Sequence, residues 1–248
     1  MKREQEKKTM SEGGLAGSKR VLVMSPHPDD VDFGCSGTIA KWSRKGTHIV
    51  YVICTSGDKG TDDPQLRPDS LTAIREEEQR RAADVVGVRE VVFLRLRDGE
   101  LQNNRGFREI LVGMVRTHRP DVVLSMDPAN TRFENAYVSH SDHRATALAV
   151  FDAIYPAARN RNFFPEQLAD GLMPHSVDKI YFSGTDRPNT WIDISETIDL
   201  KIGALRCHES QMADFEDLEA WVRDRFGQVG REKGMDYAES FRYLEIPR

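Results

Sequence analysis

Short apolar runs alternate along the chain with longer segments in which apolar residues recur every three or four positions. The runs predict buried strands, because the strands of a parallel sheet are covered on both faces. The periodic segments predict helices that pack on that sheet. We expect strands at 21–24, 48–55, 90–96, 121–125, 178–183 and 191–194, and helices at about 38–44, 70–86, 107–118, 141–155, 196–212 and 218–229.

Repeated strand–helix units joined by right-handed crossovers predict the α/β class. The expected architecture is a Rossmann-like three-layer sandwich with a mostly parallel sheet. Residues 20–248 are expected to form a single domain. Residues 1–19 are charged and then glycine-rich, without a periodic apolar pattern, so we expect a mobile lead-in.

Composition narrows the choice of partners and compartment. The net charge of the 248 residues is −5 and the basic residues are scattered, which argues against nucleic acid and anionic membranes as partners. No segment has the length of an apolar membrane span, and the three cysteines form no CxxC pair. We therefore expect a cytoplasmic protein with a small-molecule partner, and leave open whether it forms a homo-oligomer.

The first apolar run ends in the turn SPHPDD, which carries His27, Asp29 and Asp30. In open α/β sheets, ligands bind beyond the carboxyl ends of the strands, so a site is expected here. The turn lacks the GxGxxG pattern of dinucleotide-binding proteins, which disfavours a nucleotide cofactor. An imidazole and a carboxylate are instead a normal part of a zinc ligand set.

A hydrolytic zinc site needs three protein ligands and an open position for water. Two of the seven histidines, His140 and His143, lie in the segment SHSDHRA at a predicted helix start. Three residues apart, both can point into the same crevice. One can bind the metal while the other hydrogen-bonds the reacting group.

Five segments together resemble the LmbE-like/PIG-L family of zinc deacetylases, over about residues 19–212. The resemblance implies an LmbE-like fold and a metal-dependent hydrolase that removes the acetyl group from an N-acetylglucosamine-type amino sugar or its conjugate. It implies Zn²⁺ as the cofactor, with Fe²⁺ as another divalent choice. The segments are HPDDVDFGCSGT, TSGDKG, REEEQRRAA, HSDHR and HESQM.

The resemblance also implies a role for each residue of the two clusters. His27, Asp30 and His143 match the family's metal ligands, and Asp29 matches its general base. His140 matches the histidine that stabilises the tetrahedral intermediate, and a protonated imidazole there would suit growing oxyanion charge. Asp29 would take a proton from water and deliver it to the leaving amine.

Two further residues are candidates for substrate binding. Arg75 matches the family's arginine at the start of the second major helix, and its alternative is an ion pair on the surface of that helix. Asp98 follows the third strand, where it could hydrogen-bond sugar hydroxyls or have only a structural role in the loop. The rest of the segment 75–81, REEEQRR, is expected to be a solvated helix face.

Other positions depart from the family pattern or are left open. Some members carry a tyrosine two residues before the first histidine of the HxDH motif, where this chain has Val138. His208 and Gln211 match a family motif, but a structural hydrogen-bond network explains them equally well. The loops 58–69, 130–138 and 160–174 are expected to line the pocket for the rest of the substrate.

The predicted metal ligands and general base do not determine which amide is cleaved. A related amidase acting on another substrate is therefore one alternative. A non-catalytic sugar-binding module of the same fold is another, although Asp29 beside an apparently complete ligand set argues against it.

Overall fold

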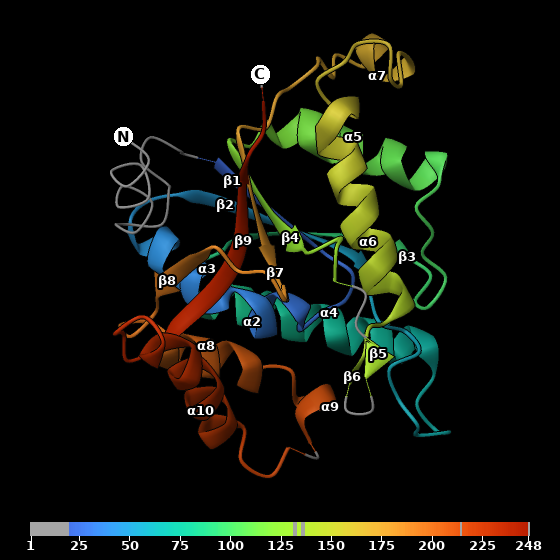
Figure 1. Ribbon diagram of the computed structural model, residues 1–248. Helices are drawn as coiled ribbons and strands as arrows, with labels where there is room; N and C mark the ends of the chain where they lie inside the picture. Colours follow the sequence, from blue (N-terminus) through green and yellow to red (C-terminus); the bar gives the residue numbers. More distant parts are fainter. Residues whose placement is uncertain (1–19, 131–132, 135–136, 214, 248) are drawn as a thin grey trace, which may run out of the picture.

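The computed structural model describes residues 20–130, 133–134, 137–213 and 215–247, so the expected lead-in at 1–19 lies outside them. At its centre is a seven-stranded sheet in the order β3-β2-β1-β4-β7-β9-β8 (Figure 1). The hairpin β5–β6 is separate from this sheet. The strands are β1 (Arg20–Ser25), β2 (His48–Thr55), β3 (Glu90–Leu96), β4 (Val122–Met126), β5 (Phe133–Glu134), β6 (Tyr137–Val138), β7 (Lys179–Ser183), β8 (Thr190–Asp193) and β9 (Ala238–Glu245).

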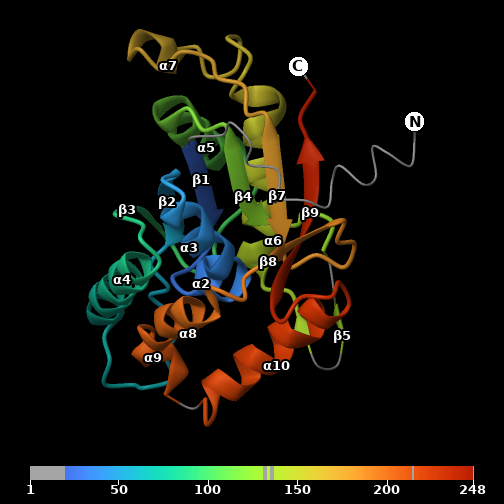
Figure 2. The same ribbon diagram turned by 90° about the vertical axis from the view of Figure 1, so that its left-hand side faces the viewer.

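Helices cover both faces of the sheet (Figure 2). One layer contains α3, α4, α8 and α10, and the other contains α5 and α6. None of the helices in the described ranges combines the length and the apolar character needed to cross a membrane. The helices are α2 (Asp30–Gly34), α3 (Ser36–Arg44), α4 (Pro68–Val85), α5 (Arg105–His118), α6 (Ser141–Asp152), the π-helix η1 (Ala153–Ala157), α7 (Glu166–Ala169), α8 (Ile198–Arg206), α9 (Glu209–Met212) and α10 (Leu218–Arg231).

Successive residues of β1 point to opposite faces and divide the core in two. Leu22 and Met24 pack in the cluster that includes residues of α5 and α6. Val21 and Val23 pack in the cluster that includes residues of α3 and α4. A strand that is covered on both sides has a continuous apolar sequence, which is why β1 could be predicted. The three-layer, mostly parallel fold is confirmed.

Strand β9, which lies antiparallel between β7 and β8, was not predicted. Its sequence AESFRYLE alternates apolar with charged residues and contains no apolar run. Glu239 is nevertheless fully buried, because it lies 2.8 Å from the ammonium of the equally buried Lys201 and accepts backbone hydrogen bonds from the start of α3. The ion pair with Lys201 thus allows Glu239 to be buried, although the local sequence pattern predicts that this residue faces solvent.

The expectation of a solvated face over 76–81 holds for Glu77, Arg80 and Arg81, which are exposed, but is wrong for the other three residues. Glu76, Glu78 and Gln79 are buried on α4. Glu76 accepts hydrogen bonds from Arg95, and Glu78 accepts them from the backbone and hydroxyl of Ser210. These partners come from distant segments, so the spacing of residues along α4 does not reveal them.

The loop 160–174 also departs from expectation. It lies with α7 at the end of the sheet opposite α2 (Figure 1). Arg116 of α5 donates to the carbonyl oxygens of Asn160 and Phe163, and His175 contacts the carbonyl of Pro120 just before β4. The loop therefore packs at the amino ends of the strands and cannot line a pocket at their carboxyl ends.

Candidate active site

The carboxyl end of the sheet brings together the residues that the sequence analysis grouped. His27 and Asp30 follow β1, whereas His140 and His143 lie at the start of α6, after β4. Because β1 and β4 are adjacent parallel strands, the segments that follow them meet at one edge. The ring centroids of His27 and His143 are 5.3 Å apart, and those of His27 and His140 are 4.9 Å apart. The two segments converge.

Asp30 joins the imidazoles of His27 and His143 through its two carboxylate oxygens. Its Oδ2 lies 3.1 Å from His27 Nδ1, and its Oδ1 lies 3.2 Å from His143 Nε2. Ligand atoms around a tetrahedral metal, with bonds of about 2.0–2.1 Å, are about 3.3 Å apart. Each of the two contacts is close to this spacing, although they use different oxygens of Asp30.

The opposite edge of the His27 ring faces two other acids. Asp98 Oδ1 lies 3.0 Å and Asp142 Oδ2 lies 3.3 Å from His27 Nε2. Asp142 is fully buried and also accepts a hydrogen bond from the backbone of Gly99 at 2.7 Å. Carboxylates placed at one ring nitrogen keep the proton there and leave the other nitrogen free to bind a metal. These contacts orient His27 with Nδ1 toward Asp30.

Within the described part of the chain, two groups of three side chains have donor atoms close enough for a metal ion, and Asp30 is in neither. They are His27 with His140 and His143, and His27 with Asp98 and Asp142, with all donor atoms of a group within 4.8 Å of one another. Asp98 and Asp142 are both buried, whereas His140 is exposed. A catalytic ion needs an open coordination position, so the histidine side of the cluster is the better candidate metal site.

The charges in this cluster favour a cation. Burial lowers the pKa of His27, but hydrogen bonds with the surrounding carboxylates outweigh burial and raise it to about 11. Burial raises the pKa of Asp98, yet the hydrogen bond with His27 brings it down to about 2. The pKa of Asp30 is also held far below its usual range, against burial, by His143 and His27. A bound divalent ion would supply the positive charge that these acids stabilise.

Asp29 lies beside this cluster in an uncommon backbone conformation, with φ at +92°. Its backbone N–H donates to Gln79 Oε1 at 2.9 Å, and its Oδ2 accepts from Arg75 Nη2 at 3.2 Å. Burial, with a contribution from the charge of Asp30, raises the pKa of Asp29 to about 7, although Arg75 opposes the shift. The carboxylate is thus held in place next to the candidate metal site.

Arg75 is itself enclosed and only 4% exposed. It donates to the carbonyl oxygens of Pro28, at 2.8 Å, and Gly57, at 3.2 Å. A Cβ added at Gly57 would lie 2.1 Å from Arg75 Nη1, and one at Gly60 would lie 2.4 Å from it. The two glycines of the TSGDKG segment therefore leave the space that this guanidinium occupies.

The family model described as "PIG-L: GlcNAc-PI de-N-acetylase" matches residues 22–154. The chain belongs to the PIG-L family. Diacetylchitobiose deacetylase of Thermococcus kodakarensis is 36% identical over 228 residues, which cover 91% of this chain and 83% of that protein. A probable N-acetyl-α-D-glucosaminyl L-malate deacetylase 2 of Bacillus anthracis is 28% identical over 206 residues, with 80% of this chain and 84% of that protein covered.

A solved structure also matches nearly the whole of this PIG-L protein. It is N,N′-diacetylchitobiose deacetylase from Pyrococcus horikoshii in complex with its inhibitor MPG, with a TM-score of 0.88 and 34% identity. The match covers 98% of this chain and 90% of that one. The fold and its deacetylase family are therefore established together.

The sequence analysis left one part of the PIG-L site aside. Gln79, which holds the backbone of Asp29, donates through Nε2 to Asp32 Oδ2 at 2.9 Å. The fully buried His208 lies 2.8 Å from the same oxygen. The expected helix 196–212 breaks at 207–208, between α8 and α9, where His208 makes this contact. Its match to a family motif was the only signal in the sequence, since a buried contact 176 residues away leaves no local pattern.

Val138 stands where some family members carry a tyrosine, so His140 is the candidate donor from this segment. Val138 is 69% exposed, and the side chain of Tyr137 is outside the described residues. His140 Nδ1 accepts a hydrogen bond from the backbone N–H of Asp142 at 3.2 Å, so a neutral ring carries its proton on Nε2. Burial and the charge of His27 lower the pKa of His140, which favours this neutral form over the protonated one.

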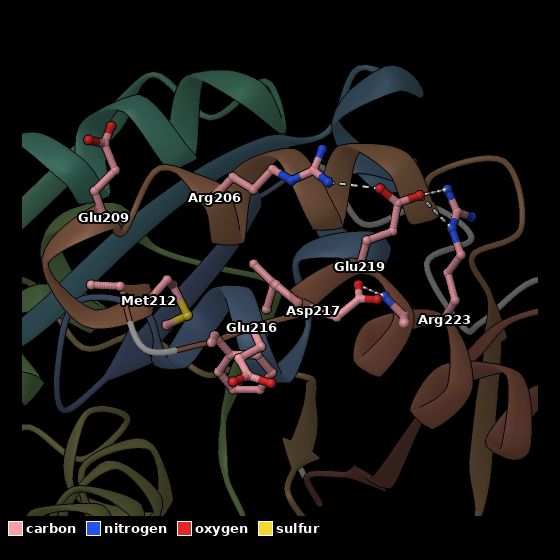
Figure 3. A pocket seen from close by; sticks show the side chains of 11 residues that line it. Arg206, Glu209, Met212, Glu216, Asp217, Glu219 and Arg223 are labelled. Carbon is pink, nitrogen blue, oxygen red and sulfur yellow. Dashed lines mark hydrogen bonds and ion pairs between the residues drawn. The ribbon is translucent and has the colours of Figure 1, made fainter.

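Two cavities flank α10. One, of about 910 Å³, lies among α8, α9 and the start of α10, with Met212 and several charged residues on its walls (Figure 3). None of the metal-site candidates lines it, and Glu219 at its rim already pairs with Arg206 and Arg223. The other, of about 590 Å³, includes Asp30 in its wall. The second cavity is therefore the one that opens on the candidate site.

Proposed function

We propose that this chain is a metal-dependent N-deacetylase that acts on the N-acetylglucosamine unit of a small glycoside. One observation carries the proposal. The carboxylate of Asp29 is held by Arg75 beside His27, His140 and His143, whose donor atoms lie within 4.8 Å of one another, and Asp30 contacts two of these rings. Relatives named as deacetylases of diacetylchitobiose and of a glucosaminyl malate support the same substrate class.

His27, Asp30 and His143 would hold the metal. Two imidazoles and one carboxylate are a normal ligand set for Zn²⁺, which we propose as the ion, and Fe²⁺ suits the same donors. A bound ion of this kind polarises the amide carbonyl and lowers the pKa of bound water toward about 7. Asp98 and Asp142 fix the orientation of the His27 ring from its other edge.

Asp29 would act as the general base and then as the general acid. Arg75 occupies Oδ2, and among the described residues no hydrogen bond reaches Oδ1. The free oxygen can accept the proton of the attacking water and pass it to the leaving amine. Arg75 keeps the carboxylate turned toward the cluster while this happens.

His140 would stabilise the developing oxyanion. Its Nδ1 is engaged by the backbone of Asp142, so the Nε2–H is the group that can donate. Direct contacts of Arg75 and Asp98 with the sugar stay predictions. In the structure, Arg75 contacts Asp29 and Asp98 contacts His27. We therefore propose that both also act by holding those two residues.

Metal content and acetate release, measured on the same preparations, test this proposal. The parent should carry about one divalent ion per chain and release acetate from N-acetylglucosamine conjugates. Asp29→Ala should keep the metal and lose about 10²–10⁴-fold in kcat. His143→Ala should lose the metal itself.

Three results would contradict the proposal in different ways. Acetate release at the parent rate by Asp29→Ala would remove the general-base role. Full metal content in His143→Ala would remove that ligand. A parent that binds the conjugates without releasing acetate would be a sugar-binding module, and one that cleaves only non-sugar amides would be a related amidase.

A further inference from the structure

We propose that the cavity of about 590 Å³ beside Asp30 binds a second, uncharged pyranose ring of the substrate. This cavity, called here the α10 pocket, lies between α10 and the carboxyl ends of β4 and β7. Its volume falls in the range of about 300–1,000 Å³ that is typical of small-molecule sites. The inference rests on the proposed function, because Asp30 at its edge marks where the acetyl group would be cleaved.

The walls of the α10 pocket differ in character. One wall is apolar and comes from α2 and α10, with Phe33, Trp221 and Phe226. The rings of Phe33 and Trp221 meet edge to face, with their centroids 5.8 Å apart. The other wall is polar and comes from the segments after β4 and β7, with Asn130 and Thr185 among its residues. A pyranose matches this pair of walls, since its ring face presents C–H groups and its rim presents hydroxyls.

Arg225 supplies hydrogen-bond donors to the same pocket. Its guanidinium carbon lies 5.4 Å from the centroid of the Trp221 ring, which holds it in place by a cation–π contact. Among the described residues, Arg225 has no carboxylate or carbonyl partner. By contrast, Arg223 on the same helix pairs with Asp199 at 2.6 Å and with Glu219 at 2.9 Å. The donors of Arg225 therefore remain available to acceptor oxygens of a ligand.

The charges of the pocket favour a neutral ring over an anionic group. Asp30, Asp127 and Asp186 contribute carboxylates to its lining. Asp127 is satisfied by Thr185 at 2.5 Å and by Arg242 at 3.3 Å, so it shapes the wall. An anionic substituent would face these acids with Arg225 as its counter-charge, whereas hydroxyl and acetamido groups meet no such repulsion.

The test compares two substrates on the parent and on pocket variants. The substrates are N-acetylglucosamine and N,N′-diacetylchitobiose, with kcat/KM for acetate release as the readout. In Trp221→Ala, kcat/KM for the disaccharide should fall about tenfold more than for the monosaccharide, because only the second ring loses its apolar contact. Arg225→Gln should lower kcat/KM for the disaccharide selectively as well, but by less. Trp221→Phe keeps an aromatic ring, so it should retain most of the parent's preference for the disaccharide over the monosaccharide.

Matched controls separate the pocket from general effects on the fold. Trp191→Ala removes a tryptophan from β8, and Arg231→Gln removes an arginine from the end of α10. Neither residue lines the α10 pocket, so neither variant should change the ratio between the two substrates. Thermal unfolding of every variant identifies any that fails to fold, and if Trp221→Ala does, Arg225→Gln carries the test.

The alternatives give different results. Equal losses for both substrates in Trp221→Ala would overturn the proposal. A selective loss for the N-acetylglucosaminyl malate conjugate in Arg225→Gln, with diacetylchitobiose unaffected, would replace the neutral ring with an anionic group. A parent that releases acetate from none of these compounds would instead contradict the proposed deacetylase function.

Discussion

The two ends of the sheet each contain a buried arginine, and the two arginines differ in what they hold. Arg75, at the carboxyl end, is 4% exposed, and Arg116, at the amino end, is 2% exposed. Arg75 binds a carboxylate, that of Asp29, in addition to two backbone carbonyls. Among the described residues, Arg116 binds only carbonyl and amide oxygens, from residues 157 to 167.

The difference indicates what each arginine contributes. A guanidinium that is satisfied only by neutral oxygens ties a loop to the fold, and burial lowers its pKa because no acid compensates the charge. A guanidinium that is paired with an acid next to a candidate metal site controls the charge and direction of that acid. Burial alone therefore does not distinguish a structural arginine from a functional one, but the partner does.

Removing each arginine should separate these roles most clearly. We expect Arg75→Met to lower kcat by about 10²-fold or more, because Asp29 loses the group that orients and ionises it. Arg116→Met should lower the free energy of unfolding by about 3 kcal/mol, through unsatisfied carbonyl groups, and leave kcat/KM of the folded enzyme within about twofold. Acetate-release kinetics and denaturant unfolding of both variants measure the two effects.

Arg75→Lys is the control for this comparison. It keeps the charge but lacks the planar fork, so it should recover only part of the activity. If the folded Arg116→Met variant lost as much activity as Arg75→Met, the distinction between a functional end and a structural end of the sheet would be wrong.

Most of the candidate site could be predicted from the sequence, because the parallel sheet places it. Apolar runs located β1 and β4, and the polar segments after such strands meet at one edge. The contacts of His27 with Asp98 and Asp142 were not predicted as such, since they join three loops. The polar face of α4 was assigned to solvent because a helical pattern does not show which distant groups cover it.

The end of the chain was the part predicted least well. Strand β9 has no apolar run, and its burial depends on partners such as Lys201 on α8. The helical spacing of Leu218, Trp221 and Val222 puts Trp221 on the apolar face of the predicted helix 218–229, but in the structure it is half-buried and lines the α10 pocket. In both cases the burial of the side chain depends on a tertiary partner or a cavity. The periodicity of its own element does not reveal either one.

Replacing Gly57 should disturb the carboxyl end of the sheet by displacing Arg75. Gly57 has a φ of +65°, and a Cβ there would lie 2.1 Å from Arg75 Nη1. We expect Gly57→Ala to displace the guanidinium, to lower kcat by about tenfold, and to destabilise the fold by about 1–3 kcal/mol. Kinetics and unfolding measurements on one preparation provide both values.

Gly171→Ala is the matched control, at the other end of the molecule. Gly171 has a φ of +80°, but nothing lies within 4 Å of a Cβ built there. It should therefore show a backbone cost of about 1 kcal/mol and the activity of the parent. Equal activity in the two alanine variants would show that the space at Gly57 is not needed to seat Arg75.

Glu76 provides the smallest and most local test, because it follows Arg75 on α4 but pairs with Arg95 and Arg80 and not with Asp29. Hydrogen bonds from Arg95 lower the pKa of Glu76 to about 2, although burial opposes the shift. A carboxylate with a depressed folded pKa stabilises the protein above its unfolded pKa of about 4.3. That contribution is lost as the pH falls from there through about 2.

The side chain of Arg95 is 66% exposed, so solvent screens the pair, and we expect an effect of only about 1 kcal/mol. The free energy of unfolding of the parent should fall by about that amount more than that of Glu76→Gln between pH 6 and pH 3. Glu77→Gln, at a 63% exposed side chain, should follow the parent profile. Parallel profiles for the parent and Glu76→Gln would mean that this ion pair adds nothing to stability.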